Sequence, residues 1–83
     1  MKVLYFAWLR QHTGIGEETV SPPPSVRDVA GLVEWLRTLG PGHAEALRDP
    51  SAIRVAVNQE FATADAHVSQ GDEIALFPPM TGG

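Results

Sequence analysis

The sequence predicts an α+β domain, in which one main helix packs across one face of a mixed sheet of about five strands. Segments of strand length and strand composition occupy both ends of the chain, and one segment of helical period lies between them. The chain has 83 residues, which is room for one small core and no second domain. We expect residues 1–77 to form this domain and residues 78–83 to form a flexible tail that ends in Gly-Gly.

Five segments are expected to form strands. Residues 2–9, KVLYFAWL, are apolar on both faces of an extended chain, which favours a central strand. Residues 11–18, QHTGIGEE, supply the turn of a hairpin. In residues 52–58, AIRVAVN, the large aliphatic side chains Ile53, Val55 and Val57 alternate with smaller or polar ones, as in a half-buried strand. The remaining strands are expected over residues 17–21, 61–63 and 73–77.

One main helix is expected to begin at Ser25, whose hydroxyl can cap it, with Asp28 three residues later near the positive end of the helix dipole. Gly40-Pro41 is a stop signal. A short second helical segment is expected over residues 43–48. The apolar side chains that recur at helical spacing are Val29, Leu32, Val33 and Leu36.

A single helix can cover only one face of the sheet. The side chains expected beneath it are Ile53, Val55, Val57, Ile74 and Leu76. The other face is expected to carry apolar side chains as well, because strand residues alternate between faces. These are Ala56, Ala75 and Phe77, with either Val3, Tyr5 and Ala7 or Leu4, Phe6 and Trp8. An exposed apolar patch on a small domain is typical of a partner site.

The composition argues against several classes of function. There is no cysteine, so the chain offers no disulfide, thiol nucleophile or thiolate metal site. The net charge is -4 and the arginines are scattered, which disfavours nucleic acid as a partner. The three histidines lack the spacing of a metal site, so we expect them to be solvated and no metal to be bound. With no apolar run of membrane-spanning length and no cleavable signal, we expect a cytoplasmic protein without membrane contact.

The last residues, FPPMTGG, raise a separate question. Pro78-Pro79 ends the final strand and stiffens the exit of the chain, because proline fixes φ and cannot donate to a ladder. Residues 78–83 can span at most about 20 Å, and Gly82 and Gly83 have no Cβ to obstruct a narrow channel. The tail is therefore either a frayed terminus or a segment that brings a terminal carboxylate into a partner's active site, where adenylation would activate it.

The motif FPPMTGG resembles the FPPVTGG-type terminus of a ubiquitin-like sulfur-carrier family, the small subunits of molybdopterin synthase. KVLYFAWLR resembles the first strand of that family, VAVNQEF its VNQ-containing hairpin, and GDEIALFPP its last strand and exit. The resemblance covers nearly the whole chain and implies a β-grasp fold. Met80 replaces the usual valine, and the triple proline and Trp8 also depart from the pattern, but none of these removes a chemical group.

The resemblance further implies a sulfur carrier in molybdenum cofactor biosynthesis. An adenylating enzyme of the ubiquitin-activating type would use ATP to activate Gly83, and a sulfur donor protein would supply the sulfur of a C-terminal thiocarboxylate. That sulfur would pass to a pterin precursor inside a heterotetramer of two small and two large synthase subunits. Phe61 and Phe77 would lie in the subunit interface. The tail residues that would insert into the large subunit are Pro78, Pro79, Met80, Thr81 and Gly82.

In this scheme the chain is a non-catalytic subunit that binds no cofactor of its own. Three alternatives remain open. One is a ubiquitin-like carrier that gives sulfur to thiamine, cysteine or tRNA, since such carriers also end in Gly-Gly. Another is a protein modifier joined to lysines, although Lys2 is the only lysine through which it could form chains. The third is a plain binding module whose tail has no role.

Overall fold

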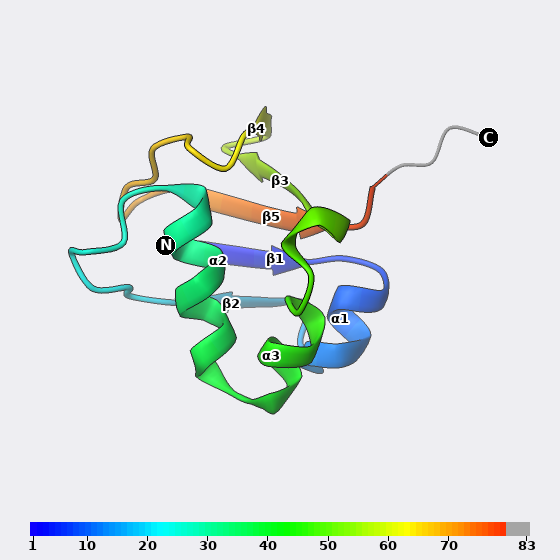
Figure 1. Ribbon diagram of the computed structural model, residues 1–83. Helices are drawn as coiled ribbons and strands as arrows, with labels where there is room; N and C mark the ends of the chain where they lie inside the picture. The colour runs from blue at the N-terminus through cyan, green and yellow to red at the C-terminus, as the bar shows by residue number, and fades with distance from the viewer. Residues whose placement is uncertain (80–83) are drawn as a thin grey trace.

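The computed structural model describes residues 1–79, which form a five-stranded mixed sheet with helices packed against it (Figure 1). The strands lie in the order β2-β1-β5-β3-β4. β1 and β5 run parallel, whereas every other neighbouring pair is antiparallel. The strands are β1 (Lys2–Tyr5), β2 (Glu17–Thr19), β3 (Arg54–Val57), β4 (Glu60–Ala62) and β5 (Glu73–Phe77).

The arrangement of these strands defines the fold. Two antiparallel pairs, β1 with β2 and β3 with β4, are joined through β5 at the centre of the sheet. Helix α2 (Val29–Leu36) lies across one face of it (Figure 1). This is the β-grasp fold of ubiquitin-like proteins, and the expected fold class is confirmed.

The first expected strand was too long. β1 ends at Tyr5, and the residues that follow form a short helix, α1 (Trp8–Thr13), which the sequence patterns did not predict. Ala7 makes the change of direction with a φ of 54°, a value that is uncommon for a residue with a side chain. Gly14 ends α1 in the left-handed region, with φ 78° and its N–H donated to the Arg10 carbonyl.

The main helix begins later than expected. Its cap is Asp28, not Ser25, because the Asp28 Oδ1 accepts a hydrogen bond from the Gly31 N–H at 2.7 Å. The preceding residues are held in an extended path by other bonds: Val68 N–H donates to the Arg27 carbonyl, and Asp28 forms a β-bridge with His67. Ser25 lies in an exposed turn before this extended stretch, so its hydroxyl cannot cap the helix.

The expected boundary at Gly40-Pro41 is confirmed, as is a short helical segment after it. α2 tightens into a 3₁₀ turn, η1 (Arg37–Leu39), before this boundary. α3 (Pro41–Ala46) then begins with proline at its first position, two residues earlier than expected. A second 3₁₀ turn, η2 (Pro50–Ala52), leads into β3.

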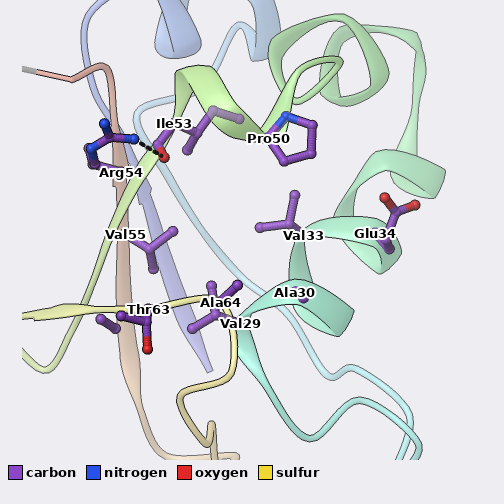
Figure 2. Close-up of a pocket in the computed structure, with 11 residues that line it drawn as sticks. Val29, Ala30, Val33, Glu34, Pro50, Ile53, Arg54, Val55, Thr63 and Ala64 are labelled. Carbon is purple, nitrogen blue, oxygen red and sulfur yellow. Dashed lines mark hydrogen bonds between the residues drawn. The ribbon is translucent and has the colours of Figure 1, made fainter.

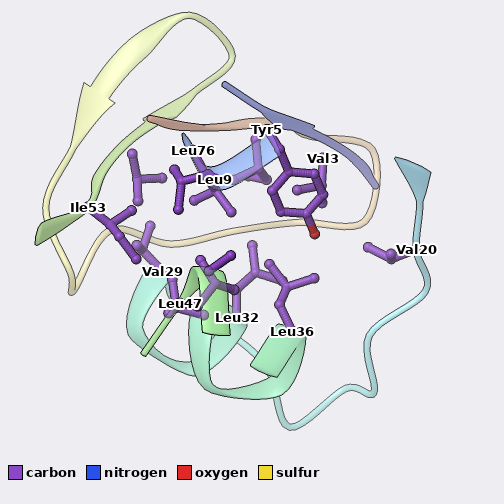
Figure 3. Packing of buried hydrophobic residues seen from close by; sticks show 14 of the residues in the cluster. Val3, Tyr5, Leu9, Val20, Val29, Leu32, Leu36, Leu47, Ile53 and Leu76 are labelled. Carbon is purple, nitrogen blue, oxygen red and sulfur yellow. The ribbon is translucent and has the colours of Figure 1, made fainter. Parts of the chain in front are cut away.

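The core lies between α2 and the sheet, as Figure 3 shows. All four residues of the predicted helical stripe are buried. Beneath them Ile53, Val55, Ile74 and Leu76 are buried and Val57 is partly buried, so the predicted core face is confirmed. Val3 and Tyr5 point to this side, which assigns Leu4 and Phe6 to the opposite face. Trp8 belongs to α1 and to neither strand face.

A polar network joins α3 to the sheet. The Tyr5 hydroxyl donates a hydrogen bond to Glu18 Oε2 at 2.7 Å, and His43 Nε2 lies 2.6 Å from the same oxygen. The His43 side chain is only 13 % exposed, so the expectation of a solvated histidine is wrong at this position. Burial, followed by the hydrogen bond and the charge of Glu18, raises the pKa of Tyr5 above its ordinary value.

Candidate partner interface and tail exit

The face of the sheet opposite α2, which we call the open face, carries a continuous row of apolar residues. The strand registers place Leu4 beside Ala75, Ala75 beside Ala56, and Ala56 beside Phe61. The next row, towards the end of β5, contains Phe77 opposite Arg54. The row runs through four of the five strands, because β1, β5, β3 and β4 are neighbours in that order. The apolar face predicted from strand alternation is therefore present.

Phe61 and Phe77 come together on this face, although they are far apart in the sequence. Their ring centroids are 5.9 Å apart, with the planes tilted by 59°. Phe61 is 83 % exposed and Phe77 is half-buried. Aromatic side chains contribute strongly to protein interfaces when they are covered. An aromatic pair left this open on a domain that already has a complete core has the character of a contact surface.

Phe6 belongs to the same surface and extends it towards α1. Its backbone N–H donates to the Leu76 carbonyl, and its side chain is 48 % exposed. The sequence left its orientation open, because the β1 segment is apolar at almost every position. The burial of Val3 and Tyr5 decides the orientation, since strand neighbours point to opposite faces.

The tail leaves the sheet beside this aromatic pair. Pro78 and Pro79 follow Phe77 directly, are half-buried, and carry the chain out beyond the end of β5 (Figure 1). Met80, Thr81, Gly82 and Gly83, the other residues predicted to form the working part of the tail, lie outside the described residues. The structure thus places the start of the tail and the Phe61–Phe77 pair at one location.

Outside this face, residues 1–79 offer few other groups of chemical interest, and Lys2 lies at the end of the sheet where β5 begins, away from the tail exit. Lys2 pairs with Glu17 at 3.4 Å, and both are exposed. Within residues 1–79, no three His, Asp or Glu side chains converge as metal ligands would. The same residues include no helix long and apolar enough to cross a membrane. What the site offers is an exposed apolar face with a chain exit at its edge.

Together, the fold and this face define a ubiquitin-like protein in which the chain exit at Pro78 lies next to an exposed apolar surface. The ThiS family matches residues 3–83, and the chain belongs to this family. The predicted resemblance is thereby confirmed.

Relatives align with the chain over its whole length. The molybdopterin synthase sulfur carrier subunit of Escherichia coli (strain K12) is 34% identical over 83 residues, covering 100% of this chain and 99% of the relative. The subunit of the same name from Homo sapiens is 35% identical over 86 residues, covering 100% and 93%.

Solved structures agree with the fold. A putative molybdopterin converting factor, subunit 1, from Pyrococcus furiosus superposes with a TM-score of 0.77 at 29% identity, covering 95% of each chain. The small archaeal modifier protein 1 of H. volcanii superposes with a TM-score of 0.75 at 27% identity, covering 96% of this chain and 97% of that one.

Proposed function

We propose that this protein is the sulfur-carrying small subunit of a molybdopterin synthase in molybdenum cofactor biosynthesis. The observation that carries this proposal is that relatives from a bacterium and from an animal, each named a molybdopterin synthase sulfur carrier subunit, align with the entire chain. The Phe61–Phe77 pair beside the tail exit supports it, because a carrier must dock on its partner while its tail reaches the reacting centre.

The chemistry takes place on the C-terminal carboxylate of Gly83. A carboxylate is a poor electrophile, so an adenylating enzyme of the ubiquitin-activating type first joins it to the α-phosphate of ATP and releases pyrophosphate. Hydrosulfide (HS⁻) supplied by the sulfur donor protein then attacks the acyl carbon, the bond from that carbon to the AMP oxygen breaks so that AMP leaves, and the S–H proton is lost to solvent. The product is a thiocarboxylate whose sulfur passes to a pterin precursor. Because the chain has no cysteine, no side-chain thiol competes for that sulfur.

The protein supplies sulfur and position, and its partners supply the catalytic groups. Phe61 and Phe77 lie in the interface with the large subunit, in a heterotetramer of two small and two large subunits. From there Pro78, Pro79, Met80 and Thr81 lead into the large subunit, and the side-chain-free Gly82 keeps the end of the tail narrow. ATP is bound by the adenylating enzyme, so this chain needs no cofactor. The setting is the cytoplasm.

Intact-mass measurement tests the proposal. Incubation with ATP, the adenylating enzyme and a sulfur donor is expected to raise the mass by replacement of one oxygen by one sulfur, located at Gly83 by fragmentation. A variant that lacks Gly82-Gly83 is the control and should keep its fold but gain no sulfur. If the truncated protein still supported sulfuration of the pterin precursor, the proposal would be wrong.

A second candidate function is conjugation to lysine side chains. Its support is the similarity to the small archaeal modifier protein 1, whose name describes a modifier. In this case the activated Gly83 forms an isopeptide bond, and mass spectrometry of digested cell extracts finds the C-terminal peptide of this chain, ending at Gly83, joined to lysines of other proteins. A carrier for thiamine, cysteine or tRNA thiolation forms the same thiocarboxylate, but it delivers sulfur with no large synthase subunit present.

A further inference from the structure

Arg54 is a charged residue on the open face, beside the tail exit. It is the first residue of β3 and lies opposite Phe77 in the strand register. Phe77 directly precedes the tail exit at Pro78. It also borders two hollows. One, of about 350 Å³, is formed with Phe61, Ala62 and Phe77. The other, of about 420 Å³, is an apolar groove between β3 and α2 that is lined by Val33, Ile53 and Val55, among others (Figure 2).

The guanidinium of Arg54 is held by the backbone on one side only. Nη1 donates to the carbonyl oxygens of Ser51 and Ile53, each at 3.3 Å, and Figure 2 shows the bond to Ile53. An arginine has five N–H donors in one plane. The two bonds from Nη1 orient that plane and leave the edge formed by Nε and Nη2 available. This edge can bind a carboxylate with two parallel hydrogen bonds.

Arg54 forms no ion pair with any of residues 1–79, in a chain where ten acidic residues outnumber six Lys and Arg. Arg37 and Arg48, by comparison, pair with Glu34 and Glu45. Apart from Arg54, the hollow on the side of Phe61 and Phe77 is lined by aromatic and aliphatic side chains alone, whereas the groove beside α2 also includes Thr63 and Glu34, the latter already paired with Arg37. A partner that covers these walls removes water from the guanidinium, and an arginine buried without an anion is strongly destabilising. A partner that fits this face therefore has to bring a negative charge to Arg54.

We infer that Arg54 is a specificity-determining residue of the open face, and that it pairs with a carboxylate side chain of the protein partner that covers Phe61 and Phe77. A protein carboxylate fits better than a phosphate because the flanking hollows are apolar, which suits the side chains that surround an acidic residue on a protein surface. The identity of the partner rests on the proposed function: it is the large subunit of the synthase.

The test compares two arginines in one binding assay. Arg54→Gln removes the positive charge and the paired N–H donors of the guanidinium from the open face. Arg27→Gln is the matched control, because Arg27 is also exposed and in no ion pair with residues 1–79, yet borders a hollow with Met1 and Gln70 at the end of the sheet where β1 and β5 begin. Affinity for the purified large subunit is measured by calorimetry at low and high salt, and thermal unfolding checks that each variant is folded.

Arg54→Gln is expected to weaken binding by about 10- to 100-fold, the range for a hydrogen bond to a charged group. The affinity of Arg54→Lys should lie between those of the wild type and Arg54→Gln, since lysine keeps the positive charge but lacks the paired N–H donors of the guanidinium. Arg27→Gln should bind like the wild type. The wild-type affinity should also decrease with salt more steeply than that of Arg54→Gln.

Three results would overturn the inference. Binding of Arg54→Gln within about twofold of the wild type would remove Arg54 from the interface while leaving the proposed function intact. A loss seen only with the adenylating enzyme, and only when ATP is present, would show that the anion is a nucleotide phosphate. Failure of the wild type itself to bind the large subunit would instead refute the proposed function, and the assigned partner with it.

Discussion

Phe61 combines a large apolar side chain with 83 % exposure, which is costly for a monomer and useful for a docking face. We expect Phe61→Ala to leave the free energy of unfolding within about 0.5 kcal/mol of the wild type, because no core contact is lost. Affinity for the large subunit should fall by about 30-fold, as for other aromatic hot spots.

Leu39→Ala is the control for Phe61, since Leu39 is also a large apolar side chain, 39 % exposed, but lies in η1 after α2, away from the open face. It should not change the affinity. Equal losses for both variants would contradict a specific role for Phe61.

The raised pKa of Tyr5 makes the free energy of unfolding depend on pH in alkaline solution. Its hydroxyl has a raised pKa in the folded state, so the folded protein keeps a proton that the unfolded chain releases above about pH 10. This contribution to stability is complete below that pH and is lost as the pH rises further. Because Tyr5 is the only tyrosine, tyrosinate absorbance reports this group alone.

We therefore expect tyrosinate to appear together with loss of circular dichroism, in one transition. Tyr5→Phe should cost about 1 kcal/mol at neutral pH, through the lost bond to Glu18, and should flatten the alkaline decrease in stability. Tyrosinate formed near pH 10 in a protein that is still fully folded would contradict this account of the site.

Among the helices and strands, α2 differs from the sequence-based expectation in its N-terminal cap, which is Asp28 and not Ser25. Asp28→Ala should lower the free energy of unfolding by about 1 kcal/mol, because it removes the acceptor of the Gly31 N–H. Ser25→Ala should have almost no effect, since Ser25 lies outside the helix. Chemical denaturation of the two variants decides between the caps, and a larger loss for Ser25→Ala would mean that the helix begins where the sequence pattern placed it.

The contact between α1 and α3 depends on Gly42. A Cβ at this position would overlap the His12 carbonyl oxygen, a backbone atom that cannot move alone. Gly42→Ala should therefore destabilise the protein by about 1–3 kcal/mol in denaturant titrations. Gly71→Ala is the matched control, since a Cβ there meets no atom within 4 Å. Equal stability of the two variants would show that the two helices are not in close contact.

The difference between predicted and observed elements has physical causes. Residues 52–58 and the α2 stripe carry several repeats of one period, so their type was clear from the sequence. α1 has six residues and one buried side chain, Leu9, which is too few to show a helical period, and the apolar run of β1 continues into it. The turn between them uses a positive φ at Ala7, where the sequence offers no glycine as a signal.

The candidate site was predictable in part. Alternation in β5 placed Phe77 opposite to Ile74 and Leu76, and the structure agrees. The closeness of Phe61 and Phe77, and the place of Arg54 beside them, depend on the order β5-β3-β4 of the sheet. That order is a property of the whole chain, and no local pattern of residues contains it.

For the whole molecule, the central claim is that this β-grasp domain docks through its open face and delivers sulfur from Gly83. The most direct test is a single turnover, in which thiocarboxylated protein is mixed with the large subunit and the pterin precursor, and both the carrier mass and the pterin are followed. We predict that the carrier returns to its carboxylate mass as the pterin gains sulfur, and that Phe61→Ala slows both changes equally. If the thiocarboxylate persisted beside the large subunit and the precursor, or if the pterin gained sulfur without loss of the thiocarboxylate, the central claim would be wrong.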